Sequence, residues 1–169
     1  MALTSRERVI RTLRHESVDR IARDVWTLPA AFFGREAELR ALMAQYPSDF
    51  GPSGYRDPLD EAPLYEQGEW TDQWGTRWVN IQPGLIGEPK HPALADWADL
   101  AHWKPPYWAL GLGYEDVNRT CAASTRFVLQ GTARPFERLQ FLRGPENAYL
   151  DLAWGTAEVR KLLEMIHDF

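Results

Sequence analysis

The chain has 169 residues, 44% of them hydrophobic and 12% aromatic, and a net charge of −5 at pH 7. This length suits one ordinary domain, and the aromatic content excludes a chain that is disordered throughout. The 24 acidic residues outnumber the 19 basic ones, which argues against a surface devoted to nucleic acid. Eight tryptophans require either a large apolar interior or a surface that another element covers.

Cysteine usage and the N-terminal residues indicate the cellular compartment. Cys121 is the single cysteine, which excludes an internal disulfide and fits a reducing cytoplasm. Arginines interrupt the apolar runs near the N-terminus, so no signal-peptide pattern is present. No stretch approaches the roughly 20 apolar residues of a membrane helix. We therefore expect a cytoplasmic protein without a membrane partner.

The first 51 residues predict alternating helices and strands. Thr4 and Glu7 have the spacing of a capping box, which opens a helix. Residues 21–26 combine β-branched and aromatic side chains, which favours a strand. The remaining elements expected here are an amphipathic helix at 35–46 and a short strand at 48–51.

The middle of the chain is rich in tryptophan. Trp70, Trp74 and Trp78 are four residues apart, but the β-branched residues and Gly75 between them favour strands over a helix. Residues 69–90 therefore predict an antiparallel meander with turns at 72–75 and 83–84. An irregular connection with a short helix near 96–102 follows.

The last third is mostly helical. Expected in chain order are a helix at 114–123, a strand at 127–131, helices at 134–143 and 145–153, and a final helix that opens at Thr156. The final helix is strongly amphipathic but has no glycine, proline or basic last turn to end it. From this pattern we expect further polypeptide to follow.

Strands that alternate with helices favour an α/β fold with a parallel sheet. The three expected core strands at 21–26, 48–51 and 127–131 do not close a barrel, and their sheet edges stay open. A (β/α)₈ barrel takes about 250 residues. The chain therefore holds the first part of such a barrel at most.

Motifs in three segments carry a family resemblance. They are Thr4-Ser5-Arg6-Glu7-Arg8-Val9 with Leu13-Arg14-His15-Glu16 and Asp19-Arg20; Asp72-Gln73-Trp74-Gly75; and Gly131-Thr132 with Phe136-Glu137-Arg138, Leu142-Arg143-Gly144, Glu146-Asn147 and Asp151-Leu152. These motifs resemble the uroporphyrinogen decarboxylase-like superfamily, which implies a TIM-barrel enzyme. We therefore expect residues 1–169 to form a single α/β unit, the N-terminal half of an incomplete TIM (β/α)₈ barrel. Residues 69–90 form an antiparallel β-meander inserted in it.

The resemblance also separates two branches of the family. Decarboxylases of porphyrin biosynthesis carry an Arg-Gln-Ala-Gly-Arg stretch after the first strand, whose arginines receive the propionates of the substrate. Residues 26–33 contain no arginine here, although a polyanionic porphyrinogen needs such guanidinium groups. The resemblance therefore implies the corrinoid-dependent methyltransferase branch, in which later strands hold zinc. We expect no cofactor within this chain, and zinc and a corrinoid only in the full-length family fold.

Active sites of such barrels lie at the carboxyl ends of the strands. Three carboxylates are candidate catalytic residues: Asp24, Asp49 and Glu137. The candidate substrate-binding residues are Trp26, Trp74, Arg134 and Arg138. A structural role is the alternative for each of them. The four histidines show no metal-ligand spacing, so no metal ligand is assigned.

The main hypothesis is that the chain is the N-terminal portion of a uroporphyrinogen decarboxylase-like methyltransferase, inactive alone, whose complete barrel binds a small-molecule substrate. A second is a non-catalytic half-barrel that assembles with another copy or with a complementing chain. A third is uroporphyrinogen decarboxylase, a lyase.

Overall fold

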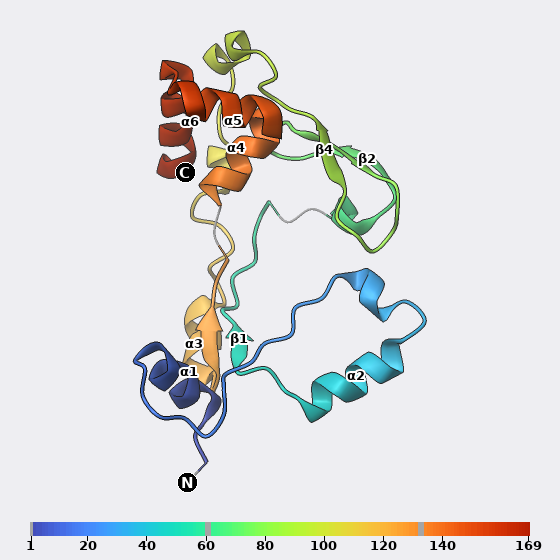
Figure 1. The fold of residues 1–169 in the computed structure, drawn as a ribbon, viewed down its shortest axis with the longest axis vertical. Helices are drawn as coiled ribbons and strands as arrows, with labels where there is room; N and C mark the ends of the chain where they lie inside the picture. Colours follow the sequence, from blue (N-terminus) through green and yellow to red (C-terminus); the bar gives the residue numbers. More distant parts are fainter. Residues whose placement is uncertain (1, 60–61, 132–133) are drawn as a thin grey trace. The chain divides into compact units, whose positions relative to one another are not determined.

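The computed structural model describes residues 2–59, 62–131 and 134–169. Thr132, part of one motif that carries the family resemblance, lies outside these residues. The chain forms two compact units, Met1–Asp57 with Leu112–Gly131 (unit 1) and Pro58–Gly111 with Thr132–Phe169 (unit 2). Each unit therefore combines two segments that are far apart in the sequence (Figure 1).

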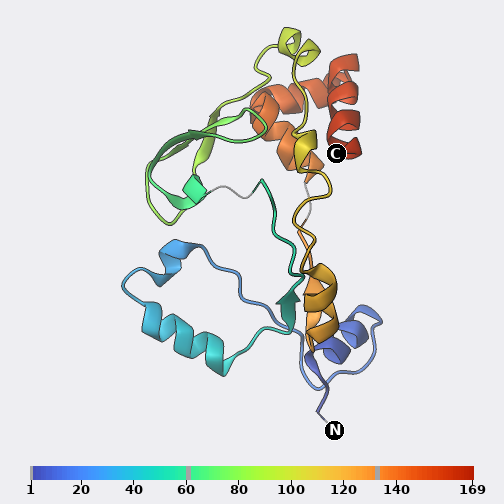
Figure 2. The same cartoon turned by 180° about the vertical axis from the view of Figure 1, so that it is seen from behind.

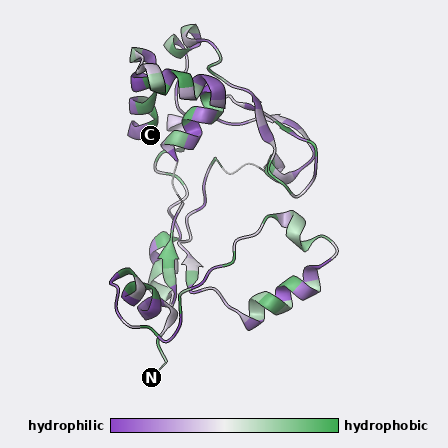
Figure 3. Ribbon diagram, in the orientation of Figure 1, coloured by the Kyte–Doolittle hydropathy of each residue, from purple (hydrophilic) through white to green (hydrophobic). Residues whose placement is uncertain are grey.

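Unit 1 is built around a pair of parallel strands. Its elements are α1 (Ser5–Leu13), the 3₁₀ helix η1 (Pro29–Phe32), α2 (Glu36–Gln45), β1 (Phe50–Pro52), α3 (Val117–Ala123) and β5 (Phe127–Leu129). β1 and β5 pair in register from Phe50 opposite Phe127 to Pro52 opposite Leu129. The two phenylalanine rings meet edge-on with centroids 6.0 Å apart, and β5 is coloured as apolar in Figure 3.

Unit 1 buries very little apolar surface. Val9 is the one apolar side chain that is fully buried among its described residues. Neither η1 nor α2 has a buried residue, and both views show α2 apart from the β1–β5 pair (Figures 1 and 2). The buried polar residues of unit 1 are Arg8, Asp49 and Ser53. Its interior is therefore held largely by polar contacts.

Unit 2 combines an antiparallel sheet with a helical cluster. Its elements are η2 (Ala62–Tyr65), β2 (Gly68–Thr71), β3 (Arg77–Asn80), β4 (Glu88–His91), η3 (Trp97–Ala101), η4 (Tyr107–Ala109), α4 (Pro135–Arg143), α5 (Pro145–Trp154) and α6 (Ala157–Asp168). The strand order β2-β3-β4 places an antiparallel meander where the sequence predicts one. The apolar core joins Trp74 and Leu94 to leucines of α4 and the buried face of α6. Unit 2 thus has the continuous apolar core that unit 1 lacks.

The predicted barrel is wrong. In the described residues one sheet has two parallel strands and the other has three antiparallel strands, so the incomplete TIM barrel is replaced by a mixed α/β arrangement. The segment 21–26 explains part of the difference, since none of its residues lies in a strand. The Asp49 amide donates to the Arg23 carbonyl at 2.9 Å, whereas the Arg23 amide donates to the Asp49 carboxylate. The Asp49 side chain therefore accepts the hydrogen bond from the Arg23 amide that a neighbouring β-strand would otherwise accept.

Several predicted boundaries also shift. The helix expected at 114–123 begins at Val117, and the helix near 96–102 is the 3₁₀ helix η3. The strands expected at 48–51 and 127–131 are the three-residue β1 and β5. None of the helices in the described segments is long and apolar enough to cross a membrane.

Candidate functional site

The carboxyl ends of β1 and β5 bring two polar side chains together. Ser53 and Gln130 follow the last residues of the two paired strands. The Ser53 hydroxyl donates to Gln130 Oε1 and accepts from the Tyr55 amide at 3.1 Å. Ser53 is 7% exposed, whereas Gln130 is exposed. Ligands of α/β sheets bind outside the carboxyl ends of parallel strands, so this edge is the candidate site.

Aromatic residues lie beside this edge. The rings of Tyr55 and Tyr114 are tilted with centroids 4.7 Å apart. Burial raises the pKa of Tyr55, and Asp57 and Tyr114 raise it further, so its phenol stays neutral at physiological pH. The Cys121 thiol donates to the Ser53 carbonyl at 3.7 Å. The site is thus a set of neutral hydrogen-bonding groups next to an aromatic pair.

A glycine allows the two segments of the site to approach each other. The Arg56 amide donates to the Gly113 carbonyl at 2.9 Å. Gly113 has a φ of 82°, and a Cβ on it would lie 1.9 Å from the Arg56 carbonyl oxygen. Any other residue would therefore push residues 53–56 away from the segment that carries Tyr114.

Asp49, a predicted catalytic carboxylate, precedes β1 at its amino end and is fully buried. Its carboxylate accepts from Arg8 Nη1 at 2.7 Å, from Arg20 Nη1 at 2.6 Å and from the Arg23 amide at 3.0 Å. This cluster of Arg8, Asp19, Arg20 and Asp49 is called the buried charge cluster below. A carboxylate saturated by two guanidinium groups is poorly placed to exchange protons with a ligand. The geometry supports a structural role for Asp49, and the catalytic assignment stays a prediction.

The pKa values of the buried charge cluster follow from these contacts. Burial alone would raise the pKa of Asp49, but hydrogen bonds from Arg20, the Arg23 amide, Ser5 and Arg8 hold it well below its ordinary value of 3.8. The Arg8 guanidinium, at 2.7 Å from Asp19, lowers the pKa of that carboxyl in the same direction. Both carboxylates are therefore charged at neutral and mildly acidic pH.

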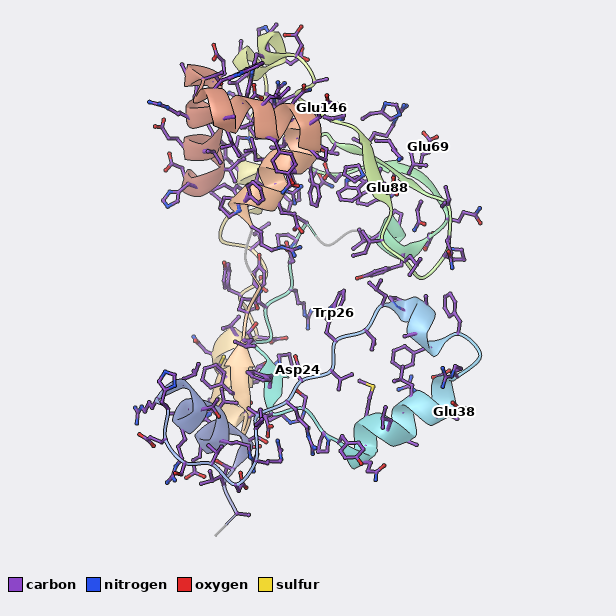
Figure 4. All side chains as sticks on the ribbon, in the orientation of Figure 1. Asp24, Trp26, Glu38, Glu69, Glu88 and Glu146 are labelled. Carbon is purple, nitrogen blue, oxygen red and sulfur yellow. The ribbon has the colours of Figure 1, made fainter. Side chains whose placement is uncertain are left out.

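Asp24 and Trp26, the other candidates in unit 1, lie on the segment without regular secondary structure that leads to η1 (Figure 4). Asp24 Oδ1 accepts from the Ser48 hydroxyl at 2.6 Å and from the Val25 amide at 2.9 Å. Trp26 is 75% exposed. Asp24 therefore fixes the start of the segment that leads to η1 and α2. The Trp26 side chain makes little contact with the rest of unit 1 and is exposed to solvent.

Trp74 and Arg138 are brought together in unit 2. The Arg138 guanidinium lies over the Trp74 ring, 4.5 Å from its centroid, and contacts Asp72 at 3.2 Å. Asp72 also accepts from the Trp74 and Thr76 amides. Burial lowers the pKa of Arg138, and Asp72 opposes that shift. These contacts fix the hairpin turn to α4, so they support a structural role for both candidates.

Arg134 and Glu137 form a pair at the start of α4. Arg134 Nη2 lies 2.6 Å from the Glu137 carboxylate, with side-chain exposures of 75% and 37%. Glu137 thus pairs with Arg134, three residues before it, which supports a structural role for both side chains. The seven candidates thus fall in two separate units, and their catalytic and binding roles stay predictions.

Ser53, Tyr55 and Gln130 were not predicted as site residues. Gln130 lies in the predicted strand 127–131, and Ser53 follows the strand predicted at 48–51. Because ligands bind at the carboxyl ends of parallel strands, this rule could have identified both positions as candidate binding residues. Their side chains become a candidate pair only through the parallel register, which the sequence does not specify.

The metal and cofactor expected for the full-length family fold find no fit in the described segments. No group of three or more His, Cys, Asp or Glu side chains gathers there in a way that could hold a metal ion. At the carboxyl strand ends the donors are hydroxyls and an amide, with one thiol, whereas zinc favours several thiolate or imidazole ligands. Neither zinc nor a corrinoid is therefore assigned to these residues.

Comparisons with protein-family models, with curated proteins and with solved structures found no match to this chain.

Proposed function

We propose that this chain supplies one wall of a small-molecule site in an enzyme of the uroporphyrinogen decarboxylase-like superfamily, on its methyltransferase-like branch. The observation that carries the site is the Ser53–Gln130 pair at the carboxyl ends of the parallel strands. The family rests on the sequence motifs in residues 4–20, 72–75 and 131–152, and the branch on the lack of arginine in residues 26–33.

The chemistry of the wall favours binding and orientation of a ligand. Ser53 is held by Gln130 and the Tyr55 amide, and the neutral Tyr55 phenol offers a donor beside an aromatic surface. The nearest guanidinium along the chain, Arg56, is paired with Asp116 at 2.9 Å. Among the described side chains of the wall no unpaired cation lies beside Ser53, so the wall suits a neutral ligand better than a porphyrinogen with many carboxylates.

We propose that the chain is inactive alone. Asp49, the buried carboxylate closest in sequence to β1, is committed to arginine partners. Unit 1 also has one fully buried apolar side chain among its described residues, and a parallel strand pair is ordinarily covered on both faces. The remaining walls of the site would come from further polypeptide. The single cysteine supports a cytoplasmic location.

The sparse core of unit 1 also favours a second candidate, a non-catalytic protein that assembles with another copy or with a complementing chain. Leu129 of β5 is 53% exposed and Leu42 of α2 is 51% exposed. Apolar side chains of this kind are covered when copies associate. Multi-angle light scattering separates the candidates, since a stable monomer at micromolar concentration would count against assembly.

The principal test is turnover by the purified chain in two assays. One follows methyl transfer from methylcobalamin to a thiol, and the other follows carbon dioxide release from uroporphyrinogen. An active family enzyme serves as the positive control. We expect background rates in both. Methyl transfer above background would overturn the proposed inactivity, and decarboxylation would favour the lyase alternative instead.

A further inference from the structure

A hollow lies at the amino ends of β1 and β5, opposite the ends that carry Ser53 and Gln130. It has a volume of about 210 Å³ and is lined by Val25, Met43, Tyr46, Pro47, Ser48 and Arg126. Ser48 precedes β1, and Arg126 directly precedes β5. We call it the amino-end hollow. All of its lining residues belong to unit 1, and none of them forms the Ser53–Gln130 pair.

The lining combines apolar groups with one guanidinium. Val25, Met43 and Pro47 offer apolar surface, and Arg126 forms no ion pair with any carboxylate in the described residues. Gly51 makes room for the arginine, because a Cβ there would lie 3.3 Å from Arg126 Cβ and 3.7 Å from its Cδ. The stem of Arg126 thus lies across β1, and its charged head reaches the hollow.

The charges around the hollow are mostly positive. The Arg23 guanidinium lies 5.1 Å from the centre of the Tyr46 ring, and Arg6 Nη2 donates to the Ser124 carbonyl at 2.7 Å. Like Arg126, neither forms an ion pair within the described segments. Two carboxylates adjoin the lining residues in sequence: Asp24 Oδ1 accepts from the Ser48 hydroxyl and the Val25 amide, and Asp49 is paired with Arg8 and Arg20. The carboxyl-terminal end of α2, carrying Met43, contributes partial negative charge, which is smaller than the full charge of the Arg126 guanidinium that lines the hollow.

We propose that the amino-end hollow binds a small organic anion, with its carboxylate on Arg126 and its aliphatic part against Val25, Met43 and Pro47. A guanidinium pairs with a carboxylate through two parallel hydrogen bonds. The volume is below that of typical drug-sized sites of about 300–1,000 Å³, so the ligand is a short aliphatic acid. The proposal is independent of the proposed function, because the two sites lie at opposite strand ends.

The test is a titration of the isotope-labelled full chain with hexanoate, followed by amide chemical shifts at constant ionic strength. We expect saturable shifts at Val25, Ser48 and Arg126. Hexylammonium, of the same length and opposite charge, should give none. Arg126→Gln should weaken hexanoate binding about tenfold or more, since it removes a charge-assisted pair.

Two further variants keep the test decisive. Arg126→Lys retains the charge without the planar fork, so we expect intermediate affinity. Arg14→Gln removes an exposed arginine of the same unit that does not line the hollow, and should bind hexanoate as the native chain does. No saturable shift with hexanoate, equal binding of hexylammonium, or native affinity in Arg126→Gln would each overturn the proposal.

Discussion

The strongest single perturbation of unit 1 is Asp49→Asn. The carboxylate is fully buried and accepts from Arg8 at 2.7 Å and from Arg20 at 2.6 and 2.9 Å. The asparagine keeps the shape but removes the charge, so Arg8, which is 6% exposed, loses one of its two anionic partners. Breaking a buried ion pair by removing one partner costs about 3–5 kcal/mol. Because Arg8 retains Asp19, we expect about 3 kcal/mol.

Native-state hydrogen exchange measures this cost at defined amides. The Phe127 amide donates to the Asp49 carbonyl at 3.1 Å, so its protection follows the opening of unit 1. A loss of about 3 kcal/mol accelerates exchange about a hundredfold, or to the intrinsic rate if unit 1 is less stable than that. Asp24→Asn is the matched control, because Asp24 is an exposed carboxylate on the neighbouring segment, and we expect a change within about 0.5 kcal/mol. A change below about 1 kcal/mol in Asp49→Asn would refute the structural role of the cluster.

Three other outcomes are expected. Lowering the pH removes protection from unit 1, because Asp19 and Asp49 have folded pKa values below the ordinary 3.8; their contribution is full above that value and declines progressively as the pH falls below it, so protection factors, corrected for the pH dependence of intrinsic exchange, that stay flat to pH 2.5 would contradict it. Asp72→Ala leaves two hairpin amides without their acceptor and should destabilise unit 2 by about 2–3 kcal/mol in urea unfolding followed by tryptophan fluorescence; an unchanged midpoint would count against the turn. Arg143→Gln breaks a pair with Asp151 at 2.9 Å, in which the side chains are 5% and 7% exposed, and should cost about 3–5 kcal/mol in the same assay, whereas a cost under 1 kcal/mol would show that the pair is dispensable.

Features that depend on residues close together in the sequence were predicted correctly. Thr4 and Glu7 form the capping box at α1 as their spacing predicts. The Thr156 hydroxyl accepts from the Val159 amide at the start of α6. Each of these features depends on residues a few positions apart, so the pattern contains all the information that it needs.

Features that depend on distant partners were missed. Arg8 falls on a polar face of the first helix, yet it is buried because Asp19 and Asp49 neutralise it. The segment 21–26 has the composition of a strand, but the Asp49 carboxylate takes the Arg23 amide. The candidate site was missed for the same reason, since Ser53 and Gln130 meet only through strand pairing across 77 positions of sequence.

The predicted fold class was wrong for the same reason, because it depends on contacts between distant segments of the chain. The alternation of elements correctly indicates a mixed α/β chain, but the barrel requires every predicted strand to join one parallel sheet. Here the parallel pairing is limited to β1 and β5, and the meander forms a separate antiparallel sheet. Local periodicity does not distinguish these arrangements, because the residue pattern of a strand does not specify which other strand it pairs with.

We propose above that unit 1 needs further polypeptide to complete its site. Hydrogen exchange on the isolated chain at pH 7 tests this directly by comparing β1 and β5 with α6, whose Val159, Leu162 and Ile166 are buried. We predict that the strand amides exchange about a hundredfold faster or more than the α6 amides, because unit 1 buries so little apolar surface. Equal protection in the two units would contradict the claim.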